Sequence, residues 1–255
     1  MDNNNKEKFH ENYIEGRNAV LEAFRSGKTI DKLFVLDGCQ DGPIKSITRE
    51  ARKHDAIINY VAKERLDQMS ETGKHQGVIA VSAAYEYAEV SDILENAERK
   101  GEPPFIIILD GIEDPHNLGA IIRTANQAGA HGIIIPKRRA VGLTPTVAKT
   151  SAGAINYTPV AKVTNISNTI KEIKEKGMWF VCADMGGTTM YDLNLTGPIG
   201  LVIGNEGDGV SKLVKENCDM TASIPMVGDI DSLNASVATG VLAYEIVRQR
   251  LKSGK

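Results

Sequence analysis

The sequence of 255 residues contains no stretch long enough to cross a membrane. Its longest apolar runs, such as 105–109, are far shorter than the roughly 20 residues that a membrane-spanning helix needs. Cysteine is scarce, and Cys39, Cys182 and Cys218 are too far apart for the spacing of a metal site or a redox motif. These absences predict a cytoplasmic protein that binds neither a membrane nor a metal ion.

The common nucleotide-binding and hydrolase motifs are also missing. A G-x-x-x-x-G-K-[ST] loop is absent, since Glu22 occupies the place of the first glycine in the candidate at 22–29. No G-x-G-x-x-G follows the first buried strand, and neither G-x-S-x-G nor H-E-x-x-H occurs. These absences argue against a nicotinamide-dependent enzyme and against the common hydrolases.

Neither sign of charge is in marked excess. The chain has 30 Lys and Arg against 33 Asp and Glu, a formal net charge of −3, and this total argues weakly against a nucleic-acid partner. A total averages over the whole surface, however, and a local basic cluster can still hold a phosphate backbone. We expect RNA contacts at Arg17 and, above all, at Lys137, Arg138 and Arg139, which follow an expected strand.

The pattern of the chain divides it into segments. We expect 1–9 to be a disordered lead and 10–84 to be a small α/β unit, because helical and strand-like stretches alternate there. The charged, helical segment 85–104 ends in Gly101 and two prolines, which favours a linker, although a crossover helix fits the same pattern. Residues 105–255 form the second domain.

Continuous apolar runs in the second domain predict strands that are buried on both faces, at 105–109, 132–136, 179–183 and 201–204. Helical patterns lie between these runs, and a long helix at 235–251 ends the segment. This alternation predicts an open, mostly parallel sheet covered by helices.

The first cluster of chemistry-bearing residues, at 110–126, follows the first of these strands. Ligands of open α/β sheets bind at this end of a strand. Asn117 is expected to cap the next helix, and Gly119 permits a close approach of another segment. Arg123 would lie among apolar residues of that helix, an unusual setting for a cation, but an ordinary capped helix explains the cluster equally well.

Two further clusters complete the set. At 201–211 a strand runs into three glycines within six positions, which let a backbone contact a flat or phosphorylated ligand, and Glu206 stands among them. At 224–240, Pro225 has no N–H and cannot belong to a fully paired strand, so its neighbours' backbone groups are available to a base. Ser232 and Asn234 precede a helix of small residues that can pack closely on the sheet or on a second subunit.

Together the three clusters resemble the signature motifs of the SpoU family, S-adenosylmethionine-dependent RNA ribose 2′-O-methyltransferases of the SPOUT class. The matching residues are NxGxxxR at 117–123, IGNEGxG at 203–209 and IPMxGxxxSLNxSxAxG at 224–240. Segment 10–84 resembles the small RNA substrate-binding domain of this family. The resemblance implies a C-terminal α/β domain with a parallel sheet and a deep trefoil knot, and a homodimer through that domain.

The resemblance also implies the roles of individual residues. The catalytic residues would be Asn117, Arg123, Glu206, Ser232 and Asn234. The residues that contact S-adenosylmethionine would be Gly204, Asn205, Gly209, Ile224, Met226 and Leu233. The implied target is a guanosine in the peptidyl-transferase loop of 23S ribosomal RNA. The alternatives are a tRNA or antibiotic-resistance rRNA methyltransferase of the same family, or a catalytically silent RNA-binding ribosome-assembly factor.

Overall fold

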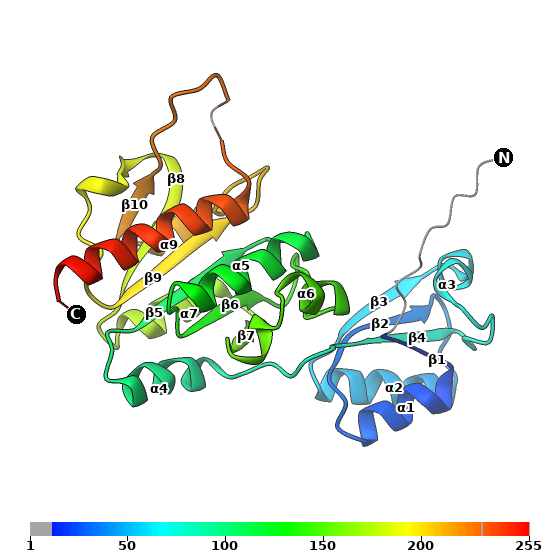
Figure 1. Cartoon of the computed structure of the whole chain (residues 1–255). Helices are drawn as coiled ribbons and strands as arrows, with labels where there is room; N and C mark the ends of the chain where they lie inside the picture. Colours follow the sequence, from blue (N-terminus) through cyan, green and yellow to red (C-terminus); the bar gives the residue numbers. More distant parts are fainter. Residues whose placement is uncertain (1–11, 231, 255) are drawn as a thin grey trace. The chain divides into compact units, whose positions relative to one another are not determined.

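The structure, a computed structural model, describes residues 12–230 and 232–254 (Figure 1). The lead expected at 1–9 lies outside the described residues. The chain divides into two compact units, of which the first extends to Glu86 and includes Gly142–Pro145. The second unit consists of Tyr87–Val141 and of the chain from Thr146 onward.

The first unit contains a four-stranded mixed sheet and three helices. The strand order is β1-β4-β2-β3, in which β2 and β3 are parallel and β4 is antiparallel to both β1 and β2. The elements are β1 (Tyr13–Glu15), α1 (Arg17–Arg25), β2 (Ile30–Leu36), α2 (Gly42–Lys53), β3 (Ile57–Val61), α3 (Lys63–Met69) and β4 (Val78–Ser82). Val20 of α1 and Ile44 of α2 are fully buried with Leu33 of β2 in one apolar core.

The second unit is built on a six-stranded sheet in which all neighbouring strands are parallel. The strand order is β10-β8-β9-β5-β6-β7. The strands are β5 (Phe105–Asp110), β6 (Gly132–Pro136), β7 (Val160–Val163), β8 (Trp179–Thr189), β9 (Ile199–Gly204) and β10 (Met220–Ser223). The helices are α4 (Val90–Lys100), α5 (Pro115–Gln127), α6 (Pro145–Thr150), η1 (Ala154–Asn156), α7 (Ile166–Lys174), η2 (Met190–Asp192), α8 (Lys212–Asn217) and α9 (Ala235–Lys252). The open parallel sheet confirms the expected fold class.

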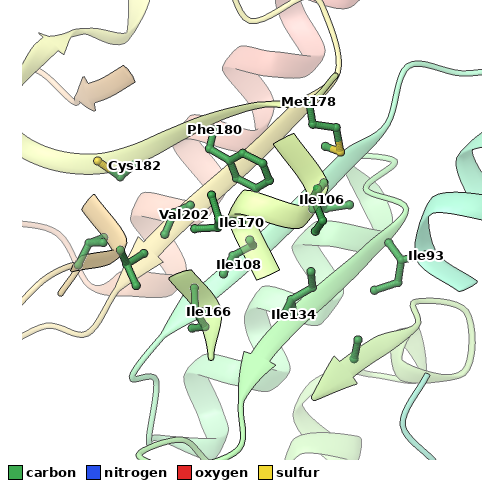
Figure 2. Packing of buried hydrophobic residues seen from close by; sticks show 14 residues of the cluster. Ile93, Ile106, Ile108, Ile134, Ile166, Ile170, Met178, Phe180, Cys182 and Val202 are labelled. Atoms are coloured by element: carbon green, nitrogen blue, oxygen red, sulfur yellow. The ribbon is translucent and has the colours of Figure 1, made fainter. Parts of the chain in front are cut away.

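The apolar runs of the central strands form the core of this unit. Ile106 and Ile108 of β5 pack with Phe180 of β8, Val202 of β9 and Ile170 of α7 (Figure 2). Strand β9 has a glycine, Gly200, beside the Phe180 ring, and a Cβ at that position would overlap the ring atoms. The aromatic ring therefore fills space that a larger residue on the neighbouring strand would occupy.

The segment 85–104, which we expected to be a linker, contains α4. Ile93 and Ala97 of this helix are fully buried, and Ile93 belongs to the core cluster of the second unit. Gly132 at the start of β6 leaves room for the Ile93 side chain, because a Cβ there would collide with it. Helix α4 is not a crossover helix either, because β4 before it and β5 after it belong to different sheets; it is a helix of the second unit.

Strands β1, β7 and β10 were not expected from the sequence, and β8 is longer than its apolar run. The three unexpected strands, β1, β7 and β10, are all edge strands of their sheets. An edge strand is covered less completely than a central one, so its apolar run is short and its periodicity is weak. The trefoil knot expected from the family resemblance concerns the threading of the chain and stays a prediction.

Candidate active site

Three polar side chains from distant parts of the second unit meet in one hydrogen-bonded network. Asn117, in the first turn of α5, donates from Nδ2 to Oε1 of Glu206. Asn234 donates from Nδ2 to Oδ1 of Asn117 at 3.0 Å and to Oε1 of Glu206 at 3.2 Å. One residue comes from each of the three sequence clusters, so the fold brings the clusters together at a single point.

The first member of this network is not a helix cap. Helix α5 begins with Pro115, and the Asp114 carboxylate accepts a hydrogen bond from the backbone N–H of His116 at 2.9 Å. The prediction that Asn117 caps this helix was therefore wrong, because the helix starts three residues earlier, with Asp114 as its cap. Asn117 is buried within the first turn, and its side-chain amide is available for the network instead.

Asn234, in contrast, caps a helix and joins the network at the same time. Its Oδ1 accepts hydrogen bonds from the backbone N–H groups of Ser236 and Val237 at the start of α9, at 3.0 and 3.4 Å. Its Nδ2 makes the two bonds to Asn117 and Glu206. The cap thus fixes the direction in which the amide group points.

The loop at 204–209 holds Glu206 in place through close backbone contacts. A Cβ on Gly204 would overlap the backbone of Gly209 and Val210, and Asn205 and Gly209 form an isolated bridge. The Asn205 Oδ1 accepts hydrogen bonds from the backbone N–H groups of Gly207 and Asp208. The glycines here therefore serve the tight folding of the loop as well as any contact with a ligand.

A cavity of about 260 Å³ lies beside this loop. Its wall includes all the residues expected to contact the cofactor, namely Gly204, Asn205, Gly209, Ile224, Met226 and Leu233. Strand β10 ends at Ser223, so the Ile-Pro-Met segment lies outside the sheet, as the proline predicts. The second and third sequence clusters thus line the same hollow.

One carboxylate in the cavity wall was missed from the sequence. Asp184, near the middle of β8, accepts a hydrogen bond from Nζ of Lys215 at 2.7 Å and another from the backbone N–H of Gly186. The hydrogen bond from Lys215 is the largest of the effects that lower the pKa of Asp184. A carboxylate directly after an apolar run is the signal that would have pointed to it.

Two of the expected catalytic residues lie outside the network. Ser232 is exposed and lines the cavity of about 260 Å³. Arg123 is exposed on α5, whereas its neighbours Ile121, Ile122 and Ala125 are buried, and it makes no hydrogen bond or ion pair within the described part of the chain. One chain therefore does not bring Arg123 to Asn117 and Glu206.

The expected basic cluster lies at a second, larger cavity, of about 810 Å³. Arg138 and Arg139 are exposed and line this cavity, which shares the 205–209 loop with the smaller one. Lys137 is half-buried, and its backbone N–H donates to the carbonyl oxygen of Val163. Two of the three cations thus face the same loop as Glu206.

Among residues 12–230 and 232–254, no helix is long and apolar enough to cross a membrane. The same residues contain no group of three or more His, Cys, Asp or Glu side chains placed to hold a metal ion.

Comparison with known proteins identifies the family. Residues 104–244 match the SpoU rRNA Methylase family, and residues 13–88 match the RNA 2′-O ribose methyltransferase substrate binding domain. The chain belongs to the SpoU rRNA methylase family. A Bacillus subtilis protein that carries the name of TrmH family tRNA/rRNA methyltransferase, YacO, is 51% identical over 245 residues, which cover 95% of this chain and 98% of that protein.

Solved structures of SpoU proteins share the fold. The SpoU methyltransferase AviRb from Streptomyces viridochromogenes, crystallised in complex with AdoMet, is 25% identical with a TM-score of 0.60, and the match covers 94% of this chain and 90% of AviRb. The A. aeolicus TrmH/SpoU tRNA modifying enzyme is 28% identical with a TM-score of 0.55, over 64% of this chain and 86% of that chain. The second unit thus has the SpoU methyltransferase fold.

The first unit corresponds to the substrate-binding domain of SpoU enzymes. Arg17, at the start of α1, donates from Nε to the backbone carbonyl of Gln76 at 3.1 Å and forms an ion pair with Asp41 at 2.6 Å. The Gln76 Oε1 accepts a hydrogen bond from the backbone N–H of Arg17. Arg17, which we expected to contact RNA, is therefore held against the segment around Gln76.

Proposed function

We propose that this SpoU protein methylates the 2′-oxygen of a ribose in RNA, with S-adenosylmethionine as the methyl donor. The target that we propose is a guanosine in the peptidyl-transferase loop of 23S ribosomal RNA. The observation that carries the proposal is that Glu206, held by Asn117 and Asn234, lines the same cavity as all six expected cofactor residues. The cofactor bound by AviRb supports the choice of donor.

The walls of the smaller cavity fit S-adenosylmethionine. Ile224, Met226 and Leu233 provide apolar surface for an adenine ring, and the backbone next to Pro225 is not used by the sheet. The Asp184 carboxylate, kept ionised by Lys215, suits a ligand that carries positive charge. When bound, S-adenosylmethionine supplies a methyl group on a sulfonium, which is already activated for transfer.

The residues of the chain then position the ribose and stabilise the loss of its hydroxyl proton. Asn117 and Asn234 fix the carboxylate of Glu206, which lines the cavity and can there bind a ribose hydroxyl. Arg123 is an unsuitable base, because a guanidinium stays protonated in proteins. We assign to it instead the binding of the target phosphate and the stabilisation of developing alkoxide charge.

A homodimer would supply the Arg123 that each site lacks. Helices α5 and α9 pack together, and α9 carries exposed apolar side chains at Val237, Tyr244 and Leu251. Exposed apolar side chains on α9, which packs against the helix that carries the unpaired Arg123, favour a second copy of this chain as the occupant. We therefore propose that Arg123 of one subunit completes the site of the other.

Mixed dimers test this arrangement. We expect Arg123→Ala and Glu206→Gln to be inactive alone, and their equimolar mixture to regain about a quarter of the wild-type rate, because half of the dimers would contain one complete site. An inactive mixture in which subunit exchange is demonstrated would place Arg123 in its own chain's site. Arg123→Lys should keep measurable activity if the charge alone matters, and a wild-type rate for Arg123→Ala would remove Arg123 from the mechanism.

We propose that RNA is bound through the first unit and through Arg138 and Arg139, and that the protein acts in the cytoplasm. Each phosphate that a cation of the protein neutralises makes the RNA affinity fall more steeply as the salt concentration rises. The Arg138→Ala/Arg139→Ala variant should therefore bind RNA more weakly and show a smaller dependence of log Kd on log salt. An unchanged salt dependence would exclude these two residues from phosphate binding.

The decisive experiment is methyl transfer from labelled S-adenosylmethionine to unmodified ribosomal RNA and tRNA, with mapping of the methylated ribose. We expect label on a guanosine of the peptidyl-transferase loop, and none with Glu206→Gln. Label on tRNA or on another rRNA nucleotide would correct the target and keep the reaction. No label on any of these RNAs or their precursors would refute methyl transfer and favour a catalytically silent RNA-binding factor.

A further inference from the structure

The larger cavity lies where an open parallel sheet offers a binding site. Its walls come from the segments that follow β5, β6, β7 and β9, and ligands of such sheets bind at these carboxyl ends. All of residues 205–209 line both this cavity and the smaller one. A ligand in the larger cavity is therefore separated from the proposed cofactor site only by the loop that carries Glu206.

The walls of this cavity are chemically divided. Leu213 of α8, with 68% of its surface exposed, offers an apolar platform beside the buried side chains of Ile166 and Val214. Arg138 and Arg139 provide positive charge, and Arg139 has a φ of 54°, a backbone conformation that non-glycine residues rarely adopt. A flat ring attached to a phosphate matches this pairing of an apolar platform with cations.

Carboxylates form the third part of the wall, and most of them are already engaged. Asp110 accepts a hydrogen bond from the backbone N–H of Ser211, and Asp114 and Glu206 have the partners described above. Within residues 12–230 and 232–254, the carboxylates of Glu113 and Asp208 accept no hydrogen bond and form no ion pair. Of these two residues, Glu113 lines only the larger cavity, whereas Asp208 lines both cavities.

We propose that the larger cavity binds the base of the target nucleotide and that this base is a guanine. The adjacent N1–H and N2–H donors of guanine can both be accepted by the Glu113 carboxylate, while Leu213 lies against the ring and Arg138 and Arg139 bind flanking phosphates. Uracil has a single such donor between two carbonyl oxygens, which a carboxylate repels. The inference rests on the proposed methyl transfer, since the ribose of this nucleotide then lies at Glu206.

Direct binding to the full-length protein provides the first test. In an NMR titration with 5′-GMP, we expect shifts of the amide signals of Gly111 and Leu213, and much smaller shifts with 5′-UMP. Glu113→Gln should weaken 5′-GMP binding roughly tenfold, because a bidentate carboxylate contact to a base is lost. The matched control is Glu98→Gln, an exposed glutamate of α4 outside the cavity, which should bind like wild type. Equal responses to both nucleotides, or wild-type binding by Glu113→Gln, would overturn the inference.

Methyl transfer provides the second test, with inosine in place of the methylated guanosine. Inosine lacks the N2 amino group, so wild type should lose roughly tenfold in kcat/KM, whereas Glu113→Gln should act alike on both RNAs. Methylation that ignores this exchange, or that occurs on uridine, overturns the guanine site and leaves methyl transfer intact. Selective 5′-GMP binding without methylation of any RNA supports the site and refutes the proposed reaction.

Discussion

Asn234 gives a sharp test of the network because its two side-chain atoms have different partners. Its Oδ1 caps α9, and its Nδ2 bonds to Asn117 and Glu206. Asn234→Ala removes both sets of contacts. Asn234→Ser keeps an oxygen that can cap the helix but has no amide donor, so the pair of variants separates the stability of the helix from the chemistry of the site.

The expected magnitudes follow from these contacts. Loss of a helix cap costs about 1 kcal/mol, and loss of the two amide bonds of this exposed side chain costs about 1 kcal/mol together. Asn234→Ala should therefore lower the free energy of unfolding by about 2 kcal/mol and Asn234→Ser by about 1 kcal/mol. For a unit of this size, these changes correspond to decreases in Tm of about 4–8 °C and 2–4 °C.

Thermal unfolding followed by circular dichroism and single-turnover methyl transfer measure the two effects separately. Both variants should lose most of their activity, because both lack the Asn234 amide, one of the two donors that hold Glu206. Equal decreases in Tm would mean that the cap does not stabilise α9. A wild-type rate for Asn234→Ser would mean that the network is not needed for the reaction, and the proposed role of Glu206 would lose its main support.

Two further predictions concern Gly204 and His131. Gly204→Ala should lower the free energy of unfolding by about 1–3 kcal/mol and weaken S-adenosylmethionine binding in equilibrium dialysis, because the new Cβ would overlap the loop backbone. The control is Gly197→Ala, at a position with open space around it. Equal Tm values for the two variants would contradict this reasoning. Burial lowers the pKa of His131, whose Nδ1 accepts a hydrogen bond from the Phe105 N–H. Since the unfolded chain then binds the proton more readily, stability should fall as the pH decreases below about 6.5. Between pH 8 and pH 5, the Tm of His131→Gln should therefore decrease less than the Tm of wild type. Equal decreases for the two proteins would contradict the role of His131.

The interior strands could be predicted from the sequence because burial on both faces requires continuous apolar runs. The run at 105–109 is the clearest case, and all of its residues are buried in β5. The edge strands β7 and β10 lack this signal, since they are covered less completely. Helix α4 could be predicted as a helix, but its membership of the second core depends on Ile93 meeting Gly132, a contact that no local pattern reveals.

The site residues were found in the sequence mainly through their resemblance to family motifs. Asn117, Glu206 and Asn234 could be singled out, yet their mutual hydrogen bonds could not, and the cap expected at Asn117 belongs to Asp114. Glu113, which carries the proposed guanine contact, had no distinguishing signal, because its role depends on which segments surround the larger cavity.

By itself the sequence determined the interior strands, most of the helices, the order of the three clusters and the family to which they belong. Local propensity, burial periodicity and short motifs are properties of neighbouring residues, so they can be read along the chain. Only the tertiary structure decided which clusters meet, because parallel strands place their carboxyl ends, and the loops that follow them, at one edge of the sheet. That arrangement joins Asn117 to Glu206, 89 positions further along the chain, and to Asn234, 117 positions further along. It leaves Arg123 of the same chain outside the network.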